Sequence, residues 1–333
     1  MTEKILVVGD IHLGVNKNNP TFFKTALDFA AWVVQICKEN QIKKVVQLGD
    51  IFHNREMIHQ PALSCANEFF NILQDLKLDI IVGNHDCLHN ETSEVNSLKL
   101  LNKWPNITIH EKVNTIDGIT FCGWGSKMED IPAKQRIIFG HFDIKGFCMS
   151  GSKLSEHGFT ASDLMAKCDL LMTGHYHGYQ TRKYGNSRLI YTGSAYQLNW
   201  GESGDDKYVF ILDTETLKVS PLKNRISPRF EYIRGMDDFS KADNNFVSVE
   251  IENPEDFLRT VSMFKTLGAK DVRTTYKEVT LKSADTPEAE TVTTGSSNIE
   301  EAVDEYTSLI PGIDDNVKLI VANQLKLFYN QCL

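Results

Sequence analysis

Five short apolar runs, each broken by a glycine and followed at once by a side chain that can bind a metal ion, constrain this chain more than any other feature. The runs read KILVVGDIH, VVQLGDIFH, IIVGNHD, RIIFGHFD and LLMTGHYH. Consecutive apolar residues rich in Val and Ile are typical of strands that are buried on both faces. A glycine at the end of each run predicts a sharp turn there. The pattern therefore predicts an α/β fold.

The side chains that follow the glycines form a candidate metal site. Open α/β sheets place their ligand sites beyond the carboxyl ends of the strands, so these side chains should converge. Any one of them could instead be a turn former, a helix cap or a buried polar group. Seven nitrogen and oxygen donors are too many for one tetrahedral ion, but they suit two ions that share a carboxylate. The predicted ligands are Asp10, His12, Asp50, Asn84, His141, His175 and His177.

These motifs resemble the calcineurin-like metallophosphoesterase family, whose blocks run D-x-H, G-D, G-N-H-D, H and G-H-x-H. Narrower features are the start DIHLG, the block GDIFH, the segment GHFDIKGF and the tetrapeptide YTGS. They are similar to the nuclease subunit of SbcC/SbcD-type DNA repair complexes, and especially to the recombination-endonuclease subunits of tailed phages. The likeness covers about residues 1–230. It implies a metallophosphoesterase α/β sandwich, in which two mixed sheets are flanked by helices.

The resemblance also implies how the ligands divide between two ions, with Asp50 as the bridge. The ligands of the first ion would be Asp10, His12, Asp50 and His177. The ligands of the second ion would be Asp50, Asn84, His141 and His175. Imidazole mixed with carboxylate or amide oxygen suits Mn or Fe better than Mg. The nuclease branch implies two divalent ions, with Mn(II) as the expected metal.

His85, which lies within the G-N-H-D block, is not among the predicted ligands and is expected to face the substrate. The resemblance implies that it stabilises the transition state or protonates the departing sugar oxygen, a role that suits a histidine. Asp86 is expected to orient the imidazole of His85. His53 resembles the second histidine of the nuclease branch and is expected near the phosphate or in support of His85. A purely structural role remains the alternative for each histidine.

The formal charge of −9 is distributed unevenly along the chain. Residues 1–234 carry 26 Lys and Arg against 26 Asp and Glu, whereas residues 235–333 carry 9 against 18. The first part is therefore neutral before any bound metal adds positive charge. The surplus of acid makes the second part an unlikely primary DNA site.

Seven cysteines form no C-x-x-C pair, which predicts reduced thiols and not a disulfide framework. The sequence contains no apolar stretch long enough to span a membrane, and it begins with a strand-like run and not a signal sequence. We therefore expect an intracellular protein without membrane association. The resemblance implies a location in the cytoplasm of a bacterium or of a phage-infected host.

The length of 333 residues exceeds one ordinary domain. The predicted division is a metallophosphoesterase catalytic domain over 1–228, a DNA-facing cap over 229–282, a flexible linker over 283–298 and a helical tail over 299–333. Apolar spacing predicts helices over 20–40 and 60–76 in the catalytic domain. The cap is expected to be a small α+β unit with strands over 245–251 and 271–281 around a helix over 254–267.

The tail over 299–333 repeats apolar residues at helical spacing, after a linker that is rich in Thr, Ser and acid. Such a short module cannot bury its apolar stripe by itself, which favours docking on a partner, although folding back on its own body is the alternative. The resemblance implies that the partner is the coiled coil of an SMC-like ATPase. It also implies a homodimer within a heterotetramer.

The leading functional hypothesis is a two-metal DNA nuclease, an exonuclease or endonuclease that acts with an SMC-like ATPase in recombination, repair or replication. One alternative keeps the chemistry but takes a cyclic nucleotide or a phosphoprotein as substrate. Phosphatases typically have an arginine–glycine pair after the GD block and a G-N-H-E block, whereas this chain has Phe52-His53-Asn54-Arg55 and Asp86. Another alternative is a non-catalytic scaffold, but such a protein should have lost ligands.

Overall fold

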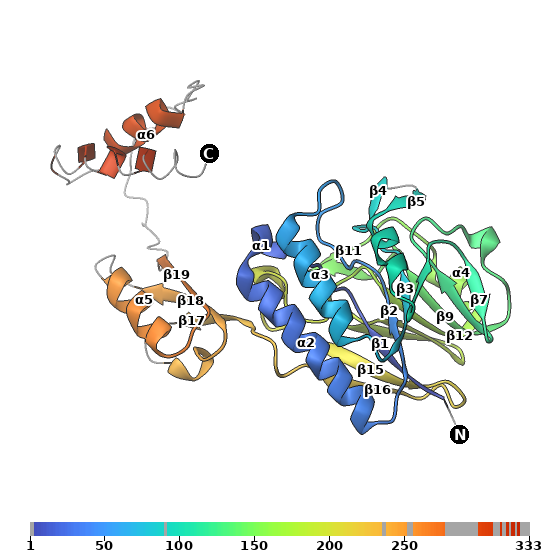
Figure 1. Cartoon of the computed structure of the whole chain (residues 1–333). Coiled ribbons are helices and arrows are strands. Elements are labelled where there is room, and N and C mark those ends of the chain that lie inside the picture. The colour runs from blue at the N-terminus through green and yellow to red at the C-terminus, as the bar shows by residue number, and fades with distance from the viewer. Residues whose placement is uncertain are drawn as a thin grey trace. The chain divides into compact units, whose positions relative to one another are not determined.

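The computed structural model describes residues 3–89, 92–234, 238–251, 256–276 and 299–308, together with positions 314, 318, 319, 321–323, 325 and 326. Contacts divide the chain into two compact units, Met1–Lys277 and Glu278–Leu333 (Figure 1). The predicted linker over 283–298 lies outside the described residues, as does much of the tail's apolar stripe. The predicted domain division stays a prediction.

The first sheet of the larger unit has six strands in the order β16-β15-β1-β2-β3-β6. The strands are β1 (Lys4–Val8), β2 (Lys44–Gln47), β3 (Lys77–Ile81), β6 (Ile107–His110), β15 (Tyr208–Asp213) and β16 (Val219–Lys223). Strands β1, β2, β3 and β6 run parallel, whereas β15 pairs antiparallel with both β1 and β16. This sheet is therefore mixed, as expected.

The second sheet also has six strands, in the order β13-β14-β12-β9-β8-β7. The strands are β7 (Asn114–Ile116), β8 (Ile119–Cys122), β9 (Gln135–His141), β12 (Cys168–Gly174), β13 (Gln180–Tyr184) and β14 (Ser187–Tyr191). Its four central strands are parallel and its two edge strands are antiparallel to their neighbours. The carboxyl ends of β9 and β12 thus lie side by side.

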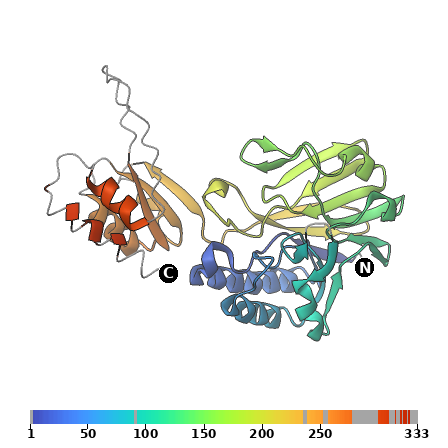
Figure 2. The same cartoon turned by 90° about the horizontal axis from the view of Figure 1, so that it is seen from above.

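Apolar side chains fill the layers on both faces of the first sheet. Val7, Phe121 and Phe139 belong to a buried cluster formed by residues of both sheets. Helices α2 (Pro20–Glu39) and α3 (Gln60–Ile72) cover the opposite face of the first sheet (Figure 2). The short helix α4 (Ala161–Met165) packs on the second sheet. The α/β sandwich with two mixed sheets flanked by helices is therefore confirmed.

Both predicted helices of the catalytic part form, and local sequence explains their ends. The Asn19 side chain accepts a hydrogen bond from the Thr21 amide and so caps α2, whose first residue is a proline. Helix α3 also has a proline in its first turn, but it ends at Ile72 and not near residue 76 as predicted. The smaller elements are α1 (Val15–Asn18), β4 (Cys87–His89), β5 (Thr92–Asn96), β10 (Cys148–Ser150), β11 (Lys153–Leu154), η1 (Ser97–Lys103), η2 (Met128–Asp130), η3 (Trp200–Glu202) and η4 (Phe239–Lys241).

A small parallel sheet follows, with β18 as its central strand. The elements are β17 (Phe230–Arg234), β18 (Phe246–Ile251), α5 (Phe257–Thr266) and β19 (Asp271–Tyr276). Phe264 of α5 packs into a core with Val247 and Val249 of β18. The strand β17 was not predicted, because only its first and fourth residues are buried and the run FEYIR therefore shows no strict alternation.

In the smaller unit the structure describes helix α6 (Ile299–Ser308). Thr307 donates its hydroxyl to the Val303 carbonyl within this helix. None of the helices in the described part of the chain is both long enough and apolar enough to cross a membrane.

Candidate active site

The structure brings all seven predicted ligands together at the carboxyl ends of the strands. Asp10 follows β1, Asp50 follows β2 and Asn84 follows β3, whereas His141 ends β9 and His175 follows β12. Two sheets therefore contribute to one site, as expected where parallel strands end at a common edge. Five of the ligands are buried, and His175 and His177 are half-buried.

Asp50 occupies the centre of the cluster. Its Oδ2 lies 3.5 Å from Nε2 of His12 on one side and 3.5 Å from Nε2 of His141 on the other. Its Oδ1 accepts a hydrogen bond from the His85 backbone amide at 2.7 Å. One carboxylate thus faces two groups of donors, which is the geometry that two ions sharing a ligand require.

The first group of donors surrounds His12. Nε2 of His12 lies 3.1 Å from Nε2 of His177, which in turn lies 3.8 Å from Oδ2 of Asp10. One ligand atom from each of these three residues lies within 4.8 Å of the other two. Two imidazoles that converge on a carboxylate at this range can hold a divalent cation between them.

The second group of donors surrounds the Asn84 side chain. Its Oδ1 lies 2.9 Å from Nε2 of His141 and 2.9 Å from Nδ1 of His175. Nδ1 of His141 lies 2.6 Å from the Leu48 carbonyl and donates to it. Because that carbonyl can only accept, the lone pair of His141 is on Nε2 and points into the cluster.

The backbone at three of the ligands adopts a conformation that non-glycine residues rarely take. His12, Asp50 and His175 have φ values of 53°, 55° and 94°. Such strain persists only where the surrounding structure enforces it, and it clusters at functional sites. Gly83 shows a second reason for the glycines in the motifs, because a Cβ there would overlap Oδ1 of Asp50.

Burial and charge perturb the titration of the cluster. Burial, and then the charge of Asp50, raise the pKa of Asp10 well above its usual value. Burial also raises the pKa of Asp50, against the opposing effect of His85. Burial lowers the pKa of His141 and of His175 to about 3, so both imidazoles are neutral at physiological pH. Crowded carboxylates beside neutral imidazoles form a donor set that a divalent cation stabilises.

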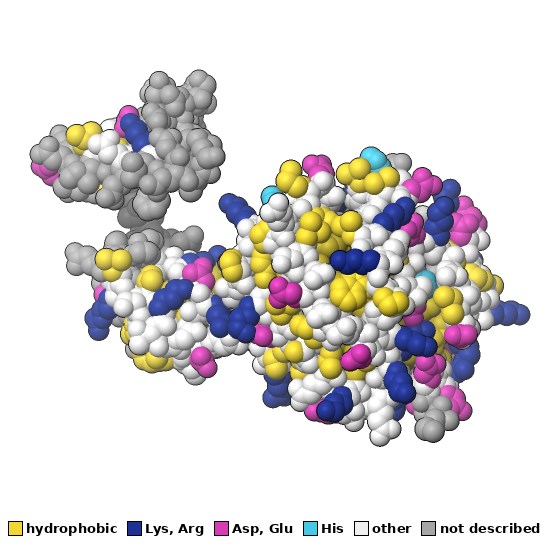
Figure 3. Space-filling view, viewed as in Figure 1, with side chains coloured by type: hydrophobic (Ala, Val, Ile, Leu, Met, Phe, Trp, Pro, Cys, Tyr) yellow, Lys and Arg dark blue, Asp and Glu magenta, His cyan; other side chains and the backbone are white. Residues whose placement is uncertain are grey.

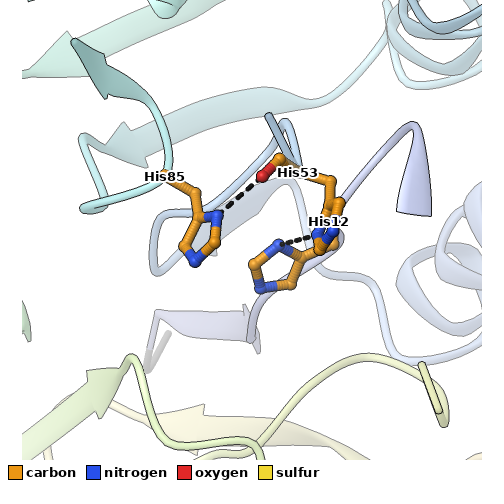
Figure 4. A group of neighbouring side chains, drawn as sticks. All are labelled: His12, His53 and His85. Carbon is orange, nitrogen blue, oxygen red and sulfur yellow. Dashed lines mark hydrogen bonds between the residues drawn. The ribbon is translucent and has the colours of Figure 1, made fainter. Parts of the chain in front are cut away.

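Two of the three predicted catalytic residues, His53 and His85, lie beside the predicted ligand His12 (Figure 4). The third, Asp86, makes contacts that differ from those expected. Nδ1 of His85 lies 2.7 Å from the His53 backbone carbonyl, which therefore orients the ring. The expectation that Asp86 orients His85 is wrong. The Asp86 carboxylate instead accepts hydrogen bonds from the backbone amides of Asp50, Gly83 and Phe52 at 2.9, 3.0 and 3.1 Å.

His53 contacts both His85 and a predicted ligand. Its Nδ1 lies 3.4 Å from Nδ1 of His12, and its ring stacks on that of His85 with centroids 5.6 Å apart (Figure 4). Ligand atoms of His12, His53 and His85 also lie within 4.8 Å of one another. Cys87 is buried nearby, and burial raises the pKa of its thiol to about 12, which argues against a nucleophilic role.

The sequence motifs did not predict two residues that lie beside the proposed ligand His177, Glu202 and Lys207. Oε1 of Glu202 lies 2.9 Å from Nδ1 of His177, and its Oε2 lies 2.7 Å from Nζ of Lys207. Burial alone would raise the pKa of Glu202, but the hydrogen bond from His177 and the charge of Lys207 outweigh it and lower the pKa to about 2. No motif marks these residues, since they lie in the run WGESGDDK beyond the last ligand block.

The cysteines in the described part of the chain agree with the prediction of reduced thiols. Cys37, Cys65, Cys122, Cys148 and Cys168 are free thiols, as is Cys87.

Lysine and arginine side chains are interspersed with aspartate and glutamate over the face of the larger unit in Figure 3. On this face, basic and acidic side chains therefore do not separate into large patches of one sign.

Comparison with known proteins supports the family resemblance that the motifs indicate. Residues 4–217 match the calcineurin-like phosphoesterase superfamily domain. The chain is 27% identical to exonuclease subunit 1 of Enterobacteria phage T4, over 97% of this chain and 98% of that protein. It is 26% identical to putative phosphoesterase 244L of Invertebrate iridescent virus 6, over 63% of this chain and 76% of that protein. It is 26% identical to the DNA double-strand break repair protein Mre11 of Methanosarcina mazei, over 65% of this chain and 37% of that protein.

Proposed function

The chain belongs to the calcineurin-like phosphoesterase superfamily, and we propose that it is a DNA nuclease that hydrolyses phosphodiester bonds with a pair of divalent ions. The observation that carries this proposal is the placement of Asp50 Oδ2 at 3.5 Å from both His12 and His141. Similarity to an exonuclease subunit along nearly the whole chain, and to a DNA break repair protein, supports DNA as the substrate.

The donor set fits two divalent ions, most readily Mn(II). Imidazole nitrogen mixed with carboxylate and amide oxygen is softer than the all-oxygen set that Mg prefers. The proposed ligands of the first ion are Asp10, His12, Asp50 and His177. The proposed ligands of the second ion are Asp50, Asn84, His141 and His175. Bound there, the ions would supply the charge that neutralises phosphate oxygens and acidifies a water molecule.

His85 is the proposed general acid. Since the His53 carbonyl can only accept, Nδ1 of His85 carries a proton, and Nε2 gains one only in the imidazolium form. That form can donate the Nε2 proton to the departing sugar oxygen and leave the neutral ring still bonded to His53. His53 holds the ring in place, and it also lines a hollow of about 440 Å³ together with Lys17, Asn18 and Asn54 among others.

The test is an assay of the purified chain with four substrates, which are single-stranded DNA, double-stranded DNA, bis-p-nitrophenyl phosphate and a cyclic nucleotide. We expect cleavage of DNA with Mn(II), and loss of that cleavage in Asp50→Asn. The control Asp205→Asn changes an acid that is 46% exposed and lies outside the proposed ligands, and it should cleave normally. Hydrolysis of the cyclic nucleotide without DNA cleavage would favour the phosphodiesterase alternative, and no hydrolysis at all would favour a scaffold.

His85→Ala separates catalysis from metal binding. The variant should retain Mn(II) and DNA binding while losing about 10²- to 10⁴-fold in rate, the usual contribution of a positioned acid or base. The matched control is His59→Ala, because His59 lines the same hollow, directly before α3, and is not among the proposed ligands or catalytic residues. Normal cleavage by His85→Ala would refute the general-acid role.

The proposed partner is an SMC-like ATPase, bound through the tail over 299–333, within a heterotetramer that contains two copies of this chain. Support comes from the separate compact unit that begins at Glu278 and from its exposed apolar side chains, such as Leu319 and Leu325. A chain that ends at Ser283 should keep Mn(II)-dependent cleavage of single-stranded DNA but no longer co-purify with the ATPase. Leu325→Asp should weaken the same interaction, and unchanged binding by the truncated chain would place the contact elsewhere.

A further inference from the structure

The Glu202 carboxylate is buried, and hydrogen-bond donors surround both of its oxygens. Oε1 faces Nδ1 of His177 at 2.9 Å and Nδ2 of Asn199 at 3.2 Å. On Oε2 converge the Lys207 Nζ at 2.7 Å, the Leu198 amide at 3.1 Å and the Ser194 hydroxyl at 3.2 Å. The Lys207 ammonium, the Leu198 amide and the Asn199 side-chain nitrogen can only donate, and the positive charge of Lys207 favours the ionised carboxylate, which can only accept hydrogen bonds.

Lys207 also contacts His177, through the backbone and not through the ring. Its side chain is 4% exposed, and besides Glu202 it contacts the backbone carbonyl of His177 at 2.8 Å. The two charges thus hold the ring of His177 through one partner and its backbone through the other. Lys207 also lies 3.7 Å from Oδ2 of Asp205, which is 46% exposed.

This arrangement determines which nitrogen of His177 is free. Because Glu202 only accepts, Nδ1 carries the proton and the lone pair is on Nε2. Nε2 is the atom that lies 3.1 Å from Nε2 of His12 and 3.8 Å from Oδ2 of Asp10. We propose that Glu202 and Lys207 form a positioning pair that fixes the tautomer and the ring orientation of His177, so that Nε2 is available to a divalent cation. This inference rests on the proposed function, since it assumes that His177 is a metal ligand.

The competing explanation is a buried ion pair that stabilises the fold and has no influence on the ring. The two explanations differ in the protonation of His177 in the metal-free protein. A positioning pair holds the Nδ1–H form before any metal binds, and outer partners of this kind typically change metal affinity by about 10- to 100-fold. A purely structural pair predicts no change in tautomer when it is removed.

The first test needs no substitution in the pair. Nitrogen NMR of the full-length protein labelled with ¹⁵N-histidine, without metal, reports the protonated nitrogen of each ring. The signals of His177 are identified by their loss in His177→Gln. We expect the Nδ1–H form, and finding the Nε2–H form in the folded wild-type protein would overturn the proposal.

The second test removes both charges together in E202L/K207M, which leaves no unpaired buried charge. We expect a mixture of both tautomers at His177, and in calorimetric titrations with Mn(II) alone, one of the two binding events weakened by about 10- to 100-fold with the other unchanged. The control Asp205→Asn, which alters the other carboxylate near Lys207, should behave like the wild type. Unchanged tautomer and unchanged Mn(II) affinity in the double variant would refute the proposal.

The outcomes separate this inference from the proposed function. A thermal melt shows whether E202L/K207M folds. If it does not, the wild-type spectrum still overturns the proposal when it shows the Nε2–H form or a mixture of tautomers at His177. If the wild-type protein binds no Mn(II), the metal site of the proposed function fails, while the tautomer of His177 still reports on the pair.

Discussion

Removing the Asp86 carboxylate should destabilise the fold and should not act as the loss of a catalytic group. The side chain is 1% exposed and accepts hydrogen bonds from three backbone amides, those of Asp50, Gly83 and Phe52. In Asp86→Ala these donors are left buried without their acceptor. Each such donor costs about 1–3 kcal/mol, which gives on the order of 3–9 kcal/mol if the costs simply add.

Two effects reduce that sum. Burial, and then the charge of Asp50, raise the pKa of Asp86 well above its usual value, so removing the charge relieves part of the strain. In addition, three donors that share one acceptor are not independent, and water can enter the space left by the carboxylate. We therefore expect a loss of about 3–5 kcal/mol in the free energy of unfolding, a large fraction of the roughly 5–15 kcal/mol that is typical of folded proteins.

Urea denaturation followed by tryptophan fluorescence measures this loss, because all four tryptophans, Trp32, Trp104, Trp124 and Trp200, lie in the unit Met1–Lys277. The matched control is His85→Ala, which removes the neighbouring ring without removing an acceptor from a backbone amide. If Asp86 oriented His85, both variants would lose activity and keep their stability. Wild-type stability of Asp86→Ala together with a strong loss of cleavage would therefore refute the reasoning.

Three further results are expected. Asp50→Ala should lose both metal ions in elemental analysis of the purified protein, because its carboxylate faces both groups of donors, and two bound ions would contradict the bridge. His141→Ala should weaken only one of the two Mn(II) binding events in calorimetry. Hydrogen bonds from His110 and Lys44 outweigh burial and lower the pKa of Asp79, so this carboxyl stabilises the fold above its unfolded pKa of 3.8. That contribution disappears as the pH falls through the lower folded pKa, and acid unfolding should therefore show a weaker pH dependence in Asp79→Asn.

The sequence pattern predicted the strands β1, β2, β3, β9 and β12, whose apolar runs end in a glycine motif, but it did not predict β8 (ITFC), which is buried at every position and whose apolar run is interrupted by Thr120. Runs such as KILVV are buried on both faces and form central strands, so their apolar content identifies them. The strand β17 and the hairpin of β10 and β11 escaped prediction, because their side chains are mostly exposed or half-buried. Their strand geometry comes from pairing with distant segments, such as Phe246–Ile251 for β17, and the local sequence carries little of that information.

The same distinction applies to the site. The predicted ligands follow strands that the pattern reveals, and the structure brings all of them together, whereas their assignment as ligands stays a prediction. Asp86 and Glu202 show what the pattern lacks, because the role of a buried carboxylate depends on its donors. For Asp86 these donors are backbone amides brought together by two turns, and for Glu202 they include a lysine and a histidine from separate segments. Residue type and spacing do not specify such partners.

The glycine of the G-N-H-D block offers a test of why the motif needs that residue. Turn formation alone would require a backbone conformation that only glycine adopts readily, but Gly83 is not among the residues with positive φ. Its requirement is spatial, since an added Cβ would overlap Oδ1 of Asp50 and crowd the Asp50 amide. Gly83→Ala should therefore displace the proposed bridging carboxylate and weaken both Mn(II) binding events in calorimetry. Gly178→Ala is the matched control, because Gly178 follows His177, has no positive φ, and a Cβ there meets no atom within 4 Å. Wild-type Mn(II) affinity in Gly83→Ala would show that the backbone relaxes around the added methyl group. The close approach of Gly83 to Asp50 would then not explain why the motif has glycine at this position.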